Sequence, residues 1–103
     1  MIDLNPEQLA EVKRILAEHA PGCEVLAFGS RVDGSARPAS DLDLVLRGPG
    51  KLDWRFLERL KDAFSASDLP FMVDVVDWHD AGEEVKAWIA KSSEVIQTSR
   101  LAP

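Results

Sequence analysis

The pattern of hydrophobic and polar positions predicts that the chain begins with an amphipathic helix over residues 6–19. Asn5 is a suitable N-cap, and Pro6 fits the first helical position. Pro21 and Gly22 end the helix. The apolar side chains that recur at helical spacing and form the buried face are Leu9, Val12, Ile15 and Leu16.

Three short segments, residues 23–28, 41–46 and 71–77, have the pattern of strands. The second alternates cleanly, and one of its faces is apolar with Leu42, Leu44 and Leu46. The opposite face carries Asp41, Asp43 and Val45. In the third segment the two faces are Phe71, Val73 and Val75 on one side and Met72, Asp74 and Val76 on the other. Val95 and Ile96 are candidates for a short final strand.

Two further helices are expected between and after these strands. Asp53 can cap a helix of about twelve residues, whose buried stripe is Phe56, Leu57, Leu60 and Phe64. The last helix is expected over residues 80–91, with Val85, Trp88 and Ile89 facing inward. Trp54 and Trp88 are expected in the core or at an interface rather than as platforms for a substrate. The order of elements predicts one α/β (α+β) domain over residues 1–103, a mixed β-sheet with helices packed on it.

Composition and charge narrow the possible partners. The chain has 18 acidic and 12 basic residues and a formal net charge of −6. This negative field repels a phosphate backbone, so nucleic acid is not expected as a direct partner. No apolar run approaches the roughly 20 residues of a membrane span, and we expect a cytoplasmic protein. The one cysteine, Cys23, excludes an internal disulfide and is expected to be buried.

Three carboxylates in the predicted strands are the strongest candidates for chemistry. Asp41 and Asp43 project from one face of their strand about 7 Å apart. If the third strand pairs beside the second, Asp74 comes within about 5 Å of them. Three negative charges so close together repel strongly, and a divalent cation is the simplest compensation. Mg²⁺ suits such oxygen ligands, because it characteristically binds a couple of carboxylates together with water and substrate phosphates.

A phosphate-binding turn is predicted upstream of these carboxylates. Gly29 and Ser30 come directly off a strand, where a glycine permits close approach of the backbone to a phosphate. Arg31 is a candidate for an additional phosphate contact, and Arg37 is a weaker one. The sequence contains neither a Walker loop nor a dinucleotide-binding fingerprint at this place.

The stretch GSRVDGSARPASDLDLVL, together with FMVDVVD downstream, resembles the signature of the DNA polymerase β-like nucleotidyltransferase superfamily. The short length resembles its minimal nucleotidyltransferase (MNT) branch, and the resemblance spans residues 5–97. It implies a fold like the palm of polymerase β, without added domains for holding a substrate. It also implies a HEPN-domain partner, a ribonuclease toxin, for which the MNT protein is the antitoxin that transfers AMP from ATP to a tyrosine.

The resemblance further implies roles for individual residues. Asp41 and Asp43 match the pair that holds two Mg²⁺ ions, and Asp74 matches the third carboxylate, which helps activate the attacking hydroxyl. Gly29 and Ser30 match the residues that grip the nucleotide phosphates. Asp77 lies three residues after Asp74, so strand alternation puts it on the opposite face, where it is expected to cap the next element.

Two other functions remain open from the sequence. The chain could be a non-catalytic, nucleotide-binding antitoxin that neutralises its partner by forming a complex. Alternatively, the acceptor of the nucleotide could be a small molecule or RNA, although no module for holding either is visible. The sequence does not give the oligomeric state.

Overall fold

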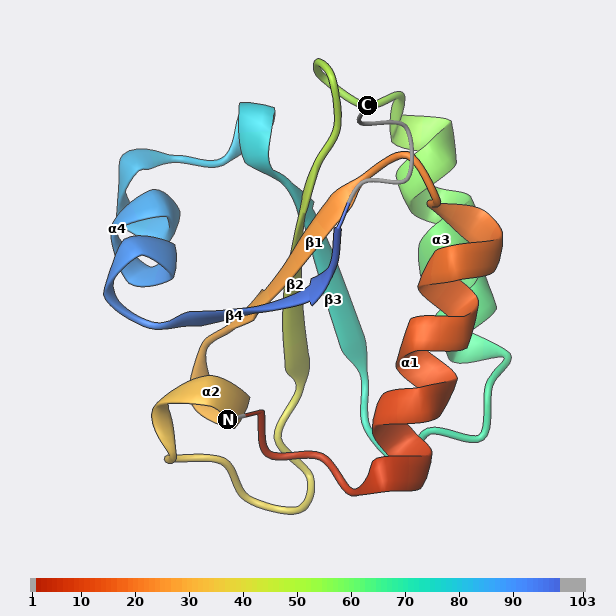
Figure 1. Cartoon of the computed structure of the whole chain (residues 1–103), viewed down its shortest axis with the longest axis vertical. Coiled ribbons are helices and arrows are strands. Elements are labelled where there is room, and N and C mark those ends of the chain that lie inside the picture. Colours follow the sequence, from red (N-terminus) through yellow and green to blue (C-terminus); the bar gives the residue numbers. More distant parts are fainter. Residues whose placement is uncertain (1, 99–103) are drawn as a thin grey trace.

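The computed structural model describes residues 2–98 of the 103-residue chain (Figure 1). Its helices are α1 (Pro6–His19), α2 (Ser30–Asp33), α3 (Trp54–Ser65), the 3-10 helix η1 (Trp78–Asp80) and α4 (Glu83–Lys91). Its strands are β1 (Glu24–Phe28), β2 (Leu42–Arg47), β3 (Val73–Asp77) and β4 (Ser93–Gln97). No helix among the described residues is long and apolar enough to cross a membrane.

The four strands form one mixed sheet in the order β3-β2-β1-β4. The strand β1 pairs antiparallel with both β2 and β4, whereas β2 and β3 pair in parallel. Because α3 connects β2 to β3, this parallel pair has the helical crossover that parallel strands require. The prediction of an α/β fold with a mixed sheet is therefore confirmed.

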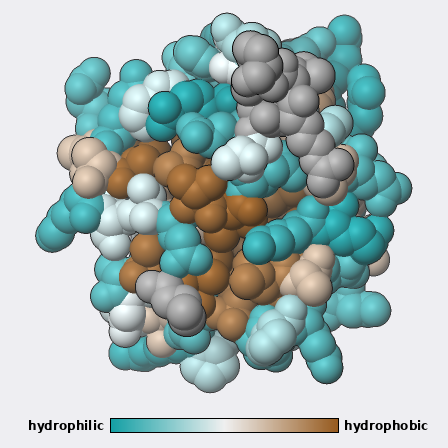
Figure 2. Space-filling view, in the orientation of Figure 1, coloured by the Kyte–Doolittle hydropathy of each residue, from teal (hydrophilic) through white to brown (hydrophobic). Residues whose placement is uncertain are grey.

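Helices cover both faces of the sheet, but unequally (Figure 1). On one face, α1 and α3 close the main core, into which β2 projects Leu42, Leu44 and Leu46. On the other face, α4 lies against a small cluster made by Leu26, Phe28, Val45 and Ile89. The alternation read from residues 41–46 is thus confirmed. In the view of Figure 2, hydrophobic residues also reach the surface between α4 and α1, surrounded by hydrophilic side chains.

Local signals placed the first and third helices accurately. Asn5 and Gln8 form a reciprocal capping box at the start of α1. The Asp53 side chain accepts a hydrogen bond from the backbone N–H of Arg55 at the start of α3. The boundaries differ more in the second half, where β3 begins at Val73 rather than at residue 71. There η1 and a short connection occupy residues that were expected in the last helix.

The prediction that Trp88 faces inward on the last helix is wrong, and neither Trp54 nor Trp88 lies in the core. Trp54 is 68% exposed and Trp88 is 54% exposed. On α4, Ile89 is the buried residue that anchors the helix, and one helical position turns the neighbouring side chain by about 100°. Trp88 therefore lies at the margin of the small cluster and faces solvent. Cys23 is buried as expected.

Candidate nucleotide- and metal-binding site

The parallel pairing of β2 with β3 brings two of the predicted carboxylates together. Asp43 and Asp74 are direct register partners on the two strands, so their backbones lie about 4.8 Å apart. Both belong to the sheet face that α4 covers, since Val45 and Val76 follow them on that face. Asp41 precedes β2 and lies on the same side by alternation. The structure thus places all three aspartates at one end of one sheet face.

The carboxylate of Asp43, in the middle of this group, lies in surroundings that disfavour its negative charge. Burial raises the pKa of Asp43, and the negative charges of Asp74 and Asp41 raise it further. Asp41 and Asp74 themselves are exposed, whereas Asp43 is half-buried. A cation next to Asp43 would favour its ionised form and remove the repulsion, because an opposite charge acts against both causes of the shift.

The turn at Gly29 touches the same carboxylate. Gly29 has φ +80°, and a Cβ atom built on it would lie only 2.6 Å from Oδ2 of Asp43. Any larger residue would therefore have to displace the Asp43 side chain. Ser30 follows as the first residue of α2. The structure consequently joins the predicted phosphate-binding turn and the predicted metal ligands into one continuous site.

The structure gives Arg31 a role other than the predicted phosphate contact. Its side chain is 95% buried, since only 5% of the residue is exposed. Four of its N–H groups donate to backbone oxygens, one to Asp3, one to Pro38 and two to Ser40. The guanidinium also stacks over the ring of Phe71, 4.2 Å from its centroid. Arg31 therefore fastens the loop that leads into Asp41, and four of its five N–H donors are committed to protein oxygens.

The weaker candidate, Arg37, lies in that same loop and is exposed. Its backbone N–H donates to the Ser40 hydroxyl oxygen at 2.8 Å. At the start of the loop, the Asp33 carboxylate accepts from both the backbone N–H and the hydroxyl of Ser35. These bonds define the path of the chain between the turn and the carboxylates.

Asp77 is separated from the site, as the alternation of β3 predicts. It is only 4% exposed. Its carboxylate accepts from the backbone N–H of Leu52 at 2.8 Å and from that of His79 at 3.0 Å. It thereby caps η1 and holds the connection before α3. The choice of Asp74 over Asp77 as the site residue is consistent with this arrangement.

The donor set fits Mg²⁺. Carboxylate oxygens from two adjacent strands are the ligands that this ion takes from proteins, with water and phosphate oxygens completing an octahedron. In residues 2–98, no three ligating side chains are close enough to enclose a metal by themselves. A cation held by two of these carboxylates would take its remaining oxygen ligands from water or from a bound phosphate.

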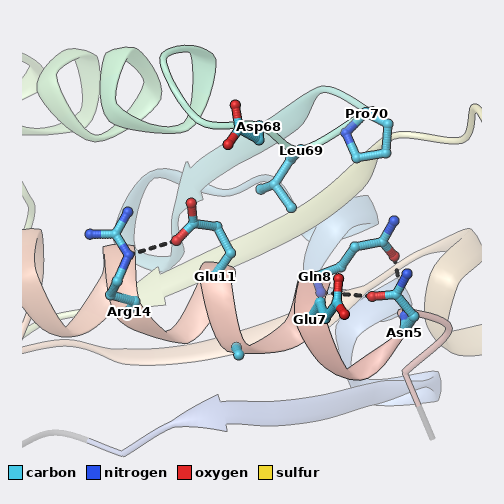
Figure 3. A pocket seen from close by; sticks show the side chains of 9 residues that line it. Asn5, Glu7, Gln8, Glu11, Arg14, Asp68, Leu69 and Pro70 are labelled. Atoms are coloured by element: carbon cyan, nitrogen blue, oxygen red, sulfur yellow. Dashed lines mark hydrogen bonds and ion pairs between the residues drawn. The ribbon is translucent and has the colours of Figure 1, made fainter.

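Two of the surface cavities differ in their relation to this site. One, of about 360 Å³, lies between α2 and the end of α4 and is lined by Gly29, Asp33, Trp88, Lys91 and Ser92. A larger groove of about 590 Å³ lies between α1 and residues 68–70 and is lined by polar side chains such as Glu7, Glu11 and Arg14 (Figure 3). Only the first shares a residue with the carboxylate site. Sequence reasoning did not identify Lys91 and Ser92 as lining this cavity, because no motif marks them.

A glycine turn packed against paired strand carboxylates is the kind of site in which a nucleoside phosphate is bound together with a divalent cation. Fold and site together define a nucleotidyl-transfer class of protein. Residues 10–100 match the family model described as polymerase beta, nucleotidyltransferase, and the chain belongs to this family. The predicted resemblance is confirmed.

Similar proteins agree with this placement. Over 96 residues the chain is 47% identical to a Haemophilus influenzae protein named probable protein adenylyltransferase MntA, covering 93% of this chain and 84% of that one. A chain in a mutant of the MntA–HpeT toxin–antitoxin complex has a TM-score of 0.73 at 20% identity, covering 89% of this chain and 74% of its own length. The chain is thus a nucleotidyltransferase enzyme by family.

A second solved structure shares the fold. It is the complex of a tri-AMPylated Shewanella oneidensis HEPN toxin with its MNT antitoxin. The matched chain has a TM-score of 0.65 at 18% identity, and the alignment covers 94% of this chain and 75% of the other.

Proposed function

We propose that this protein transfers AMP from ATP to a hydroxyl group of a partner HEPN toxin, with tyrosine as the acceptor residue, and so acts as its antitoxin. The observation that carries the proposal is the pairing of Asp43 with Asp74 directly beside the Gly29 turn. The name of the Haemophilus influenzae relative supports a protein acceptor. The solved complexes of similar fold support a HEPN partner.

In this reaction the acceptor oxygen forms a bond to the α-phosphorus of ATP, and the bond from that phosphorus to the bridging oxygen breaks. Pyrophosphate leaves, and the proton of the acceptor hydroxyl is lost. Two Mg²⁺ ions, when bound, lower the pKa of the hydroxyl and neutralise charge on the leaving pyrophosphate. We expect this chemistry to take place in the cytoplasm, where ATP is the available nucleotide donor.

Each site residue has a defined part in this scheme. Asp41 and Asp43 would hold the two metal ions, and Asp74 would be the third carboxylate, which would ligate one ion and help activate the acceptor hydroxyl. Gly29 lets the phosphates approach the backbone, and Ser30 supplies a hydroxyl to them. Because the phosphates also complete the coordination of the metals, nucleotide and cation are expected to bind together.

The experiment is to mix the chain with a candidate HEPN-domain partner from the same genome, Mg²⁺ and ATP, and to measure the intact mass of that partner. The expected result is a shift by whole numbers of AMP groups. The Asp41→Asn and Asp43→Asn variants should give no shift. Asp62→Asn, at an exposed position of α3, is the matched control and should behave as the unmodified chain.

The other functions predict different results. If the Asp41→Asn and Asp43→Asn variants still neutralise the partner and no partner mass changes, the chain is a binding antitoxin and the enzymatic proposal fails. If label from α-labelled ATP appears on a small molecule or RNA and never on the partner, the acceptor has been assigned wrongly.

A further inference from the structure

We propose that the cavity between α2 and α4 is the nucleoside subsite of the ATP site, with Trp88 as the platform for the base and Lys91 as the cation that faces the phosphates. This inference rests on the proposed function in so far as ATP is the substrate. It adds two residues that the sequence motif does not contain, both supplied by α4.

The position of the cavity relative to the carboxylates fits one nucleotide. Gly29 belongs to both places, because it lines the cavity and also lies against Oδ2 of Asp43. Across the sheet, Asp43 pairs with Phe28, and Phe28 pairs with Ser93. The chain just before Ser93 therefore lies two strand spacings, about 10 Å, from Asp43. A nucleotide whose α-phosphate lies at the carboxylates is long enough to place its nucleoside in this cavity.

Trp88 has the exposure and surroundings of a stacking residue. Trp88 is 54% exposed and lines a cavity of about 360 Å³, while Ile89 beside it packs in the small apolar cluster on the sheet. An exposed tryptophan on a fixed helix offers a large flat surface whose position costs little to order on binding. Bases stack on such surfaces, and this stacking contributes substantially to nucleotide affinity.

Lys91 is the basic residue that lines the cavity. It lies three positions after Trp88 on α4, so both side chains occupy the same side of the helix. Lys91 lies near enough to α2 for its charge to act on Asp33. Hydrogen bonds from Ser35 lower the pKa of Asp33 most, and the positive charge of Lys91 lowers it further. With four of the five N–H donors of Arg31 committed to backbone oxygens, Lys91 is placed to supply the positive charge that the phosphates need.

The first arm of the test measures binding without chemistry. The protein is titrated with a non-hydrolysable ATP analogue and, separately, with inorganic tripolyphosphate, each with Mg²⁺, by calorimetry. Trp88→Ala should weaken binding of the analogue by about tenfold or more and leave tripolyphosphate binding unchanged. Trp88→Phe should restore most of the loss. Trp54→Ala removes an even more exposed tryptophan from α3 and should change neither affinity.

The second arm tests the cation. Lys91→Met should lower the affinity for both the ATP analogue and tripolyphosphate, because it removes a phosphate contact rather than a base contact. It should also make both affinities less dependent on salt concentration. Lys13→Met, an exposed position of α1, is the matched control. Unchanged analogue binding in Trp88→Ala would overturn the subsite, even if AMP transfer occurs. A protein that binds the analogue through Trp88 but transfers no AMP would instead overturn the proposed reaction alone, and one that binds no nucleotide would overturn both.

Discussion

The two faces of the sheet differ in what they contribute. The face under α1 and α3 is closed by apolar side chains, including Val12, Leu16 and Leu60, that are almost completely buried. The face under α4 has only a small apolar cluster, and beside it lie carboxylates and an open cavity. One face therefore provides most of the stability, while the other is left free for polar groups that would weaken a core.

The strand β2 contributes to both faces with adjacent residues. Leu44 is fully buried in the main core, and Asp43 before it points to the opposite face with a raised pKa. Since successive side chains alternate across a strand, a shift of register by one residue would exchange the two roles. Residues that stabilise the fold and residues of the candidate site therefore alternate along the same strand, on opposite faces of the sheet.

The largest expected effect comes from removing bulk on the closed face. Leu44→Ala should lower the free energy of unfolding by about 2–5 kcal/mol, because it leaves a cavity in a packed core. Urea denaturation measures the loss. Val95→Ala is the control on the edge strand β4, where the side chain is 51% exposed and the change should stay within about 0.5 kcal/mol. A loss below about 1 kcal/mol for Leu44→Ala would show that this face is less rigid than its burial indicates.

The next effect concerns the open face and should appear in activity. The added Cβ of Gly29→Ala would displace the Asp43 carboxylate, so AMP transfer should fall by about 10²-fold, on the scale of losing one group that stabilises transition-state charge. Gly34→Ala is a matched control, because Gly34 has a similar φ of +89° but open space around it. Both variants should lose about 1 kcal/mol of stability from the unfavourable φ. Equal activity in the two would contradict the role of this contact.

Sequence reasoning predicted some features better than others, for physical reasons. The helices α1 and α3 were predictable because their caps and periodicity are local properties of the chain. The alternation of β2 identified both faces, but the adjacency of Asp43 and Asp74 depended on which strands pair. That information lies in the tertiary structure rather than in either segment.

The surroundings of two residues, Arg31 and Trp88, could not be predicted because they depend on distant contacts. Arg31 looked like a phosphate ligand because of its place in the motif, yet its partners include a backbone oxygen of Asp3, 28 residues away. Trp88 looked like a core residue because it adjoins apolar neighbours on a short helix. Its exposure depends on how α4 meets the sheet, which periodicity over nine residues does not determine.

A smaller effect separates two aspartates of β3. Asp77→Ala should lower the free energy of unfolding by about 1–3 kcal/mol, because the N–H groups of Leu52 and His79 lose their acceptor. AMP transfer by the folded fraction should persist. Asp74→Ala should have the opposite effects. The free energy of unfolding should change by no more than about 0.5 kcal/mol because the residue is exposed, whereas AMP transfer should be lost. Thermal unfolding and the partner-mass assay, applied to both variants, test the assignment; the opposite pattern would exchange their roles.

The smallest expected effect is a gain in stability at the site itself. Because the pKa of Asp43 is raised above the usual 3.8, folding favours its protonated form, and this contribution is lost as the pH rises through the folded pKa. Asp43→Asn removes the charge, so without metal it should be more stable than the unmodified chain at neutral pH. The difference should shrink as the pH falls towards 3.8, which melting temperatures across that range would show.

Magnesium together with a non-hydrolysable ATP analogue should reverse the order. A ligand that binds only the folded state stabilises it, and the unmodified chain retains the carboxylate that the cation needs. Its melting temperature should therefore rise more than that of Asp43→Asn. A lower metal-free stability of Asp43→Asn at neutral pH would mean that the Asp43 carboxylate makes stabilising contacts that outweigh its burial and repulsion. The face under α4 would then contribute to stability as the face under α1 and α3 does. The proposed difference between the two faces would be contradicted at Asp43.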